Sequence, residues 1–318
     1  MKLVSRRRTP RPLRRSFLAS WNACASAGVL ALLLICLAAQ AGAQTGAKSG
    51  GHGWVVSRQP SRLVNGAPVA FTVKPPAALQ SLNGRWLDHD LAFVFDSHSH
   101  AWWALGGVGL RRRPGLYPLK LTGVTKRGGE ISFERKFAVA AGKYRSISVK
   151  VATKFTEPDP EQLRTIAADK VIKDKTFAET TPEREWGGSF RAPLQAPVSD
   201  VFGTRRVFNG KVQSVHQGLD YAAKAGDEIH AVNSGTVLLA RPLYFEGNCV
   251  VLDHGQGLLT LYLHLSQFKV KEGEHVERGQ ALGLVGGTGR ATGPHLHLAV
   301  RWRGEYLDPA TLLGLRLP

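Results

Sequence analysis

Between residues 50 and 152, short runs of alternating apolar and polar residues are separated by turn signals. One such run is 131–137 (Ile-Ser-Phe-Glu-Arg-Lys-Phe), and the turn signals include Asn65-Gly66, Asn83-Gly84 and Pro114-Gly115. A period of two residues with β-branched and aromatic side chains is typical of strands, and regularly spaced turns favour an antiparallel sandwich. We therefore expect a small Ig-like β-sandwich in this region.

One helix is expected after the predicted sandwich. Asp159 followed by Pro160 is a favourable helix start, and apolar residues recur with helical spacing from Glu161 to Ala178. The polar segment 180–191 is expected to be a linker or a strap across the next domain. From about 199 to 315 the pattern again indicates strands and turns. The chain is thus predicted to be all-β, with a C-terminal antiparallel sheet domain and one connecting helix.

The first 43 residues have a different composition. Seven Lys or Arg residues and no acidic residue precede an apolar run at about 27–39, and small residues follow it. This layout is typical of an export signal, and the run is shorter than the roughly 20 residues of a membrane span. We expect cleavage, no stable membrane span, and a location in the periplasm or cell envelope. Arg14-Arg15 resembles a twin-arginine motif, so that route and general secretion both remain open.

These patterns predict four parts: an export signal (1–43), an accessory sandwich (50–152), a helical linker and strap (153–198) and a C-terminal β-domain (199–316). The formal net charge of +18 falls to about +11 without the seven leader cations. A basic exported protein suits an anionic polymer such as bacterial cell wall. Nucleic acid is the competing partner, but the chain has neither a basic helix nor an interleaved aromatic platform.

Cysteine usage indicates how the exported part is stabilised. Only Cys249 remains once the leader is removed, so no internal disulfide can form. Cys249 lies in an apolar strand pattern, which predicts a buried structural thiol.

Three short motifs carry the candidate chemistry. They are His216-Gln-Gly-Leu-Asp220, Tyr262-Leu-His264-Leu-Ser and Pro-His295-Leu-His297. Alternate side chains of a strand share a face, so the two histidines of the last motif are expected to lie opposite its leucines and to face a groove. The same rule predicts that Tyr262 and His264 face a groove as well.

Together, these motifs offer two imidazoles and one carboxylate suited to Zn²⁺, with two further histidines for acid–base work. Three protein ligands leave a fourth zinc position for water, which is typical of a catalytic site. The chain has no His-Glu-x-x-His sequence, and imidazole can take or give a proton near neutral pH. Gly218 favours a loop entering a strand between His216 and Asp220, in preference to a helix. The residues therefore indicate a zinc hydrolase.

The three motifs, together with Phe202-Gly-Thr-Arg-Arg206 and the glycine-rich segment 287–293, resemble the lysostaphin-type zinc endopeptidases. The resemblance covers about 202–313. It implies cleavage of peptide stems or cross-bridges in bacterial peptidoglycan, by a protein expected to be a monomer. A non-catalytic relative that binds the cell wall is the main alternative, and such a protein is expected to have lost metal ligands.

The same resemblance assigns roles to five residues. It implies that His216, Asp220 and His297 hold one Zn²⁺ per chain. It also implies that His264 and His295 act on the water and on the developing oxyanion.

Further residues are candidates for the groove. Arg205, Arg206 or Arg290 is expected to dock substrate carboxylates, unless all three are solvated surface charges. Tyr262 is a fourth substrate-binding candidate, and Asn209 is expected to approach the zinc as an inhibitory or supporting group. The cluster of Asp96, His98 and His100 indicates either a second metal site or, by preference, an exposed turn.

Overall fold

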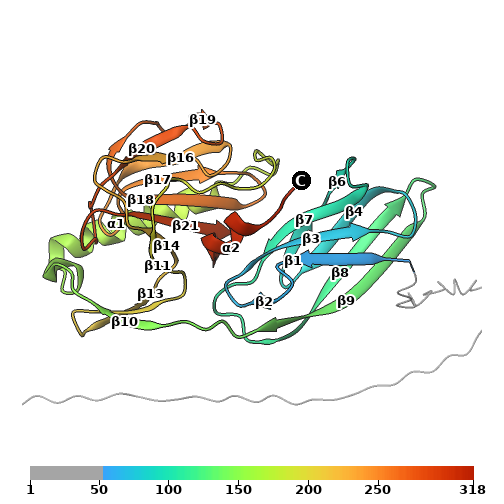
Figure 1. Ribbon diagram of the computed structural model, residues 1–318, viewed down its shortest axis with the longest axis horizontal. Coiled ribbons are helices and arrows are strands. Elements are labelled where there is room, and N and C mark those ends of the chain that lie inside the picture. The colour runs from blue at the N-terminus through green and yellow to red at the C-terminus, as the bar shows by residue number, and fades with distance from the viewer. Residues whose placement is uncertain (1–52) are drawn as a thin grey trace, which may run out of the picture. The chain divides into compact units, whose positions relative to one another are not determined.

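The computed structural model describes residues 53–318 (Figure 1). The predicted export signal, residues 1–43, lies outside the described residues. Within the described part of the chain, no helix has the length and the apolar character needed to cross a membrane.

The N-terminal part of the described chain, residues 55–140, forms two sheets, and the alternating pattern predicted its strands (Figure 1). The first sheet has the order β1-β3-β7-β6, and the second has the order β2-β9-β8-β4-β5. All pairs are antiparallel except β2 with β9. The strands are β1 (Val55–Gln59), β2 (Leu63–Val64), β3 (Pro68–Lys74), β4 (Leu79–Trp86), β5 (His89–Ala92), β6 (Val94–Asp96), β7 (Ala101–Gly107), β8 (Gly115–Thr125) and β9 (Glu130–Ala140).

Aromatic residues join these two sheets. The ring of Phe71 on β3 lies 5.2 Å from that of Trp86 on β4 and 5.6 Å from that of Phe137 on β9 (centroid distances). Phe71 and Trp86 are fully buried. Because one aromatic cluster draws on both sheets, the sheets share a core.

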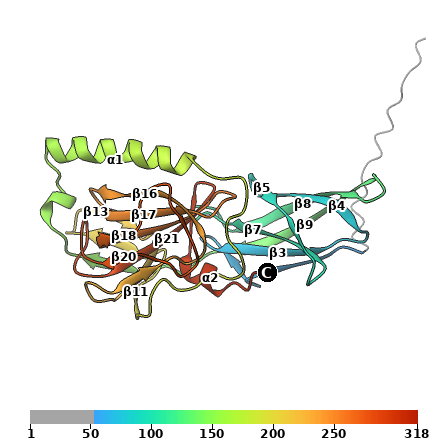
Figure 2. The same cartoon turned by 90° about the horizontal axis from the view of Figure 1, so that it is seen from above.

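The predicted helix is α1 (Pro160–Ala178). Asp159 accepts hydrogen bonds from the first-turn amides and forms a capping box with Gln162, so the helix begins where the sequence indicated. A short 3₁₀ turn, η1 (Thr153–Phe155), precedes it. Figure 2 shows α1 along one side of the C-terminal sheet, next to β16.

The C-terminal part is built on a ten-stranded sheet with the main order β11-β14-β21-β18-β17-β16-β19. Strands β15, β20 and β22 extend it, and β10 (Ser146–Val149), β12 (Arg205–Phe208) and β13 (Val212–Val215) form a separate small sheet. The strands of the large sheet are β11 (Val198–Asp200), β14 (Gly218–Tyr221), β15 (Glu228–His230), β16 (Gly235–Leu243), β17 (Gly247–Asp253), β18 (Leu258–Phe268), β19 (His275–Val276), β20 (Ala281–Val285), β21 (Leu296–Trp302) and β22 (Glu305–Leu307).

One short helix, α2 (Pro309–Gly314), forms where only strands and turns were predicted. Asp308 explains it, because its carboxylate accepts a hydrogen bond from the Ala310 amide and a proline occupies the first helical position. The segment 180–191 contains no helix or strand. The Thr181 amide donates to Asp253 and the Glu185 amide to the His254 carbonyl, so the segment is tied to the large sheet.

Strand β21 buries the face that alternation predicted. Leu296, Leu298, Val300 and Trp302 are at most 2% exposed. Cys249 on β17 is buried as expected, and burial raises the pKa of its thiol, which fits a structural role.

The prediction for Tyr262 is wrong. The register pairs Leu263 with His297 and Leu261 with Ala299, so these leucines share the face of His297. Tyr262 points the other way, is fully buried, and accepts a hydrogen bond from the Val232 amide at 2.9 Å. Strand β18 is covered on both faces, so the position of a polar residue did not reveal which face meets the groove.

Candidate metal centre

Three side chains from two chain segments converge in the C-terminal domain. Asp220 on β14 and His297 on β21 are direct antiparallel partners, so they project from the same face of the sheet. His216 lies just before β14. Its Nε2 atom is 3.0 Å from Asp220 Oδ1 and 3.0 Å from His297 Nδ1, and the last two atoms are 2.8 Å apart.

The protonation of these groups indicates that a cation belongs between them. His216 Nδ1 lies 2.8 Å from the Val201 carbonyl oxygen, which can only accept, so this nitrogen carries the proton. With that proton committed to Val201, the neutral form of His216 presents its Nε2 lone pair to a cation shared with the carboxylate of Asp220. Four-coordinate zinc with bonds of about 2.05 Å would place its ligand atoms roughly 3.3 Å apart. The observed spacings are close to this value, so the three residues fit a zinc-sized ion.

Within residues 53–318, this is the one group of three or more acidic, histidine or cysteine side chains arranged to hold a metal. The cluster around Asp96 is an exposed turn, as preferred from the sequence. Its carboxylate accepts hydrogen bonds from the backbone amides of His98 and Ser99.

Gly218 permits the close packing at this site. A Cβ atom on Gly218 would lie 2.4 Å from His297 Nε2 and 2.5 Å from the Leu298 carbonyl oxygen. Any side chain here would therefore displace His297 or its strand.

A second set of charges holds the carboxylate of Asp220. Arg206 donates through Nη2 to Asp220 Oδ2 and to Asp200, and its Nε is 2.9 Å from Asp200 Oδ2. Burial alone would raise the pKa of Asp220, but its contacts with the imidazoles of His216 and His297 hold it well below its usual value. Asp220 is therefore an anion with Oδ1 directed at the two histidines and Oδ2 committed to Arg206.

Two further histidines face the same centre. His264 Nδ1 lies 2.8 Å from the Thr288 carbonyl oxygen, and His295 Nδ1 lies 2.9 Å from that of Gly293. Each ring thus carries a proton on Nδ1, so Nε2 is the acceptor atom of its neutral form. The ring centroids are 4.7 Å apart, and His295 Nε2 is 4.0 Å from Asp220 Oδ1.

His264 reaches the centre through a backbone irregularity. Its φ of +68° interrupts the regular alternation of β18, and its amide donates to the Glu246 carbonyl. Burial, followed by the neighbouring His295 and His297, lowers the pKa of His264 to about 3. Its imidazole is therefore neutral and able to accept a proton.

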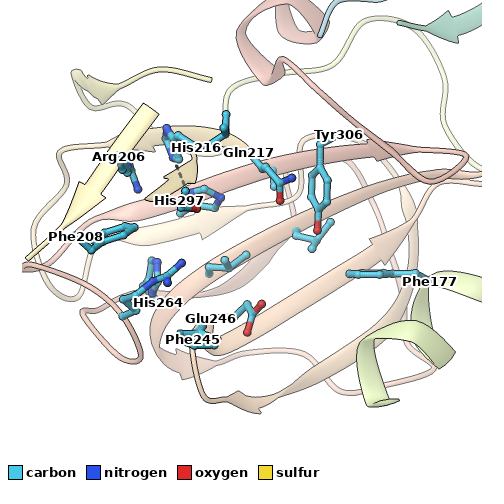
Figure 3. Close-up of a pocket in the computed structure, with 16 residues that line it drawn as sticks. Phe177, Arg206, Phe208, His216, Gln217, Phe245, Glu246, His264, His297 and Tyr306 are labelled. Atoms are coloured by element: carbon cyan, nitrogen blue, oxygen red, sulfur yellow. Dashed lines mark hydrogen bonds between the residues drawn. The ribbon is translucent and has the colours of Figure 1, made fainter. Parts of the chain in front are cut away.

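A groove passes over this centre (Figure 3). His216, His264 and His297 lie on its wall, with Arg206 and Phe208 beside them. Away from the histidines, the lining becomes aromatic and apolar. These residues are Phe177, Phe245, Leu261, Leu263, Ala299 and Tyr306.

The structure separates the other predicted groove residues. Arg290 lines the groove, and Arg206 lines it while bound to Asp220. Arg205 lines a neighbouring hollow that contains none of the five predicted metal and catalytic residues. The prediction for Asn209 is wrong, because its amide exchanges hydrogen bonds with the backbone of Val151 at 3.0 and 2.9 Å. Asn209 joins the end of β12 to the segment that follows β10.

Sequence reasoning missed Glu246. Its Oε1 atom pairs with Lys173 Nζ of α1 at 2.6 Å, its Oε2 atom has no hydrogen-bond partner, and its side chain lines the groove. The Asp169 carboxylate of α1 also accepts a hydrogen bond from the Tyr244 amide. Phe177 of α1 also lines the groove, so α1 forms one end of it. An acidic residue in a turn before a strand gave no signal of this contact.

Comparison with known proteins agrees with the site. Residues 214–309 match peptidase family M23. The chain is 43% identical over 112 residues to peptidoglycan DD-endopeptidase ShyA of Vibrio cholerae, a match that covers 35% of this chain and 26% of the relative. It is 38% identical over 130 residues to DD-carboxypeptidase/endopeptidase Mpg of Neisseria meningitidis, covering 41% and 30%. The chain therefore spans less than a third of either relative.

A solved structure matches a longer stretch. A Pseudomonas aeruginosa crystal structure described as a peptidase M23 is 29% identical, with a TM-score of 0.59, and the match covers 80% of this chain and 96% of that one. The family resemblance predicted from the motifs is confirmed. The stretch that matches peptidase family M23, residues 214–309, contains the whole His-His-Asp centre.

Proposed function

We propose that this protein is an exported zinc-dependent endopeptidase that hydrolyses peptide bonds in the stem peptides or cross-bridges of peptidoglycan. The observation that carries the proposal is the convergence of His216 Nε2, Asp220 Oδ1 and His297 Nδ1 within 3.0 Å of one another. The names of ShyA and Mpg, which describe peptidases of this kind, support the reaction and the substrate class.

The proposed metal site holds one Zn²⁺ per chain through those three atoms. Bound zinc lowers the pKa of water from about 16 towards 7 and polarises a carbonyl oxygen. Arg206 holds the second oxygen of Asp220, which keeps the carboxylate oriented. The Val201 carbonyl fixes the tautomer in which His216 presents a lone pair.

The proposed catalytic residues are His264 and His295. In each, Nδ1 donates to a backbone carbonyl, so Nε2 is the atom that the neutral imidazole offers to the water. One imidazole takes a proton from the attacking water and the protonated form returns it to the leaving amine. With two rings 4.7 Å apart, the second imidazole is close enough to support the developing oxyanion.

We further propose that the first two sheets form an Ig-like accessory sandwich within residues 50–152, followed by a linker and strap (153–198) and the peptidase domain (199–316). Lettered in chain order, the sheets have the arrangements A-B-E-D and A′-G-F-C-C′, which are those of Ig domains. Two further features support this proposal. Trp86 is buried on the strand equivalent to C, and the Tyr117 hydroxyl donates to the Arg113 carbonyl like a tyrosine corner.

The proposed location is the periplasm or cell envelope, because the substrate lies there and residues 1–43 have the composition of an export signal. The protein is proposed to act as a monomer and to bind no nucleic acid. The alternative of a non-catalytic wall-binding protein is disfavoured by the presence of all three metal donors.

The test combines metal analysis with wall digestion. Purified protein is expected to contain one zinc per chain and to release peptides from purified peptidoglycan, with activity lost to a chelator and restored by zinc. His297→Ala should lose tight zinc binding, while His295→Ala should retain zinc and lose turnover. His98→Ala, in the exposed turn, is the matched control. Stoichiometric zinc in His297→Ala, or wall digestion unaffected by chelator, would refute the proposal.

A further inference from the structure

Arg290 is held rigidly in the groove. Its Cζ atom lies 4.6 Å from the ring centroid of Phe208 and 4.6 Å from that of Phe245. The Arg290 amide donates to the Phe245 carbonyl at 2.9 Å, which fixes the backbone of the loop. Cation–π contacts with two rings orient the planar guanidinium without using its N–H donors.

Those donors have no anionic partner among the described residues. Arg206, by contrast, contacts both Asp200 and Asp220. Glu246 attracts Arg290 over a longer range, but it forms its ion pair with Lys173. Burial lowers the pKa of Arg290, so its positive charge is incompletely compensated in this structure. A half-buried guanidinium with free donors is suited to bind an anion from outside the chain.

The position of Arg290 in the groove indicates which anion it would bind. It lines both hollows that meet at His264: one contains His216 and His297, and the other contains His295. The loop that carries Arg290 also provides the Thr288 carbonyl that orients His264. A group bound to Arg290 would therefore lie beside the bond that the proposed catalytic residues attack.

We propose that Arg290 is a specificity-determining residue that binds a free carboxylate of the substrate next to the scissile peptide bond. The inference rests on the proposed function and extends it to the substrate class, a peptide with an unamidated carboxylate. We test two carboxylates of a stem peptide with this chemistry: the C-terminal carboxylate, and the side-chain carboxylate of a diamino-dicarboxylic residue.

The experiment uses three synthetic stem peptides: one with both carboxylates free, one amidated at the C-terminus and one amidated at the side-chain carboxylate. We expect the zinc-loaded wild type to cleave the free peptide with kcat/KM about 10- to 100-fold above that of one amidated peptide, as for loss of one charge-assisted contact. The disfavoured peptide identifies the carboxylate. Arg290→Gln should reduce the difference to about twofold, because its amide carries no charge. Arg290→Lys should retain an intermediate preference, since it keeps the charge without the planar fork.

Arg127→Gln is the matched control, because it removes an exposed arginine in the turn between β8 and β9, away from this groove, and it should keep the wild-type preference. Calorimetric binding of the same peptides to zinc-free protein separates this inference from the proposed function, since binding needs neither metal nor turnover. Failure of every peptide to be cleaved would count against the proposed function alone. Equal binding of the three peptides by the wild type, or a preference that survives in Arg290→Gln, would overturn the role of Arg290.

Discussion

The support of the metal centre by Arg206 leads to a quantitative prediction. Its guanidinium joins Asp200 to Asp220, and its side chain is only 18% exposed. Arg206→Met keeps much of the length and removes the charge. Oδ2 of Asp220 would then lose its partner, and the carboxylate could rotate away from the two histidines.

Two independent estimates of the effect agree. A hydrogen bond to a charged group contributes about 1.5–3 kcal/mol. Loss of a group that orients a metal ligand weakens metal binding by about 10- to 100-fold, which corresponds to about 1.4–2.7 kcal/mol. We therefore expect Arg206→Met to bind zinc about 10- to 100-fold more weakly than the wild type.

Competition between the protein and a chromogenic zinc chelator measures this difference directly, with thermal unfolding as a check of the fold. Arg145→Met is the control, because Arg145 contacts Asp200 at 2.7 Å but not Asp220 and is 53% exposed. Its zinc affinity should change by less than about threefold. If Arg206→Met held zinc as tightly as the wild type, Arg206 would be a packing residue only and the proposed orientation of Asp220 would be wrong.

Three further predictions concern stability. Lys173→Met should lower the free energy of unfolding by about 1–3 kcal/mol, since Glu246 would remain buried without its partner. The double variant Lys173→Met/Glu246→Leu should lose less of the free energy of unfolding, as measured by urea denaturation. Equal losses in the single and double variants would contradict this prediction. Burial lowers the pKa of His254 to about 4, so the unfolded chain binds the proton first and stability should fall as pH drops from about 6.5 to 4. His254→Gln should reduce that slope by up to about 1.4 kcal/mol per pH unit in thermal melts between pH 7 and 4, and an unchanged slope would refute the assignment. Leu298→Ala, in the core face of β21, should lower the free energy of unfolding by about 2–5 kcal/mol. Leu116→Ala, at a 67% exposed position, should lower it by less than about 0.5 kcal/mol. Similar losses for the two variants would show that the core was misplaced.

Local rules were sufficient for much of the fold. The capping residue Asp159 and the proline after it located the start of α1 to the residue, because a helix start depends on the adjacent backbone amides. Alternation located the buried face of β21, because one of its faces consists only of large apolar residues. The metal motifs could also be recognised in the sequence, because His216 and Asp220 are close together and His297 shares a strand face with His295, two residues before it.

Residues whose role depends on distant partners were beyond such rules. Alternation with the neighbouring leucines predicted that Tyr262 faces the groove, yet its hydroxyl is satisfied inside the core by the Val232 amide. Asn209 was placed near the metal, but its amide completes the backbone bonding of Val151. Both errors have the same origin: a polar side chain can be satisfied by any donor or acceptor that the fold brings near.

The sequence by itself determined the class of elements, the donor types of the candidate metal site and the family resemblance of the C-terminal domain, because these follow from short-range periodicity and motif spacing. Only the tertiary structure decided that Arg206 supports Asp220 while Arg290 stands free between two aromatic rings. It also decided that α1 forms one end of the groove through Phe177 and pairs Lys173 with Glu246. These arrangements join residues many positions apart, and their charges and contacts depend on strand register and packing, which no local pattern encodes.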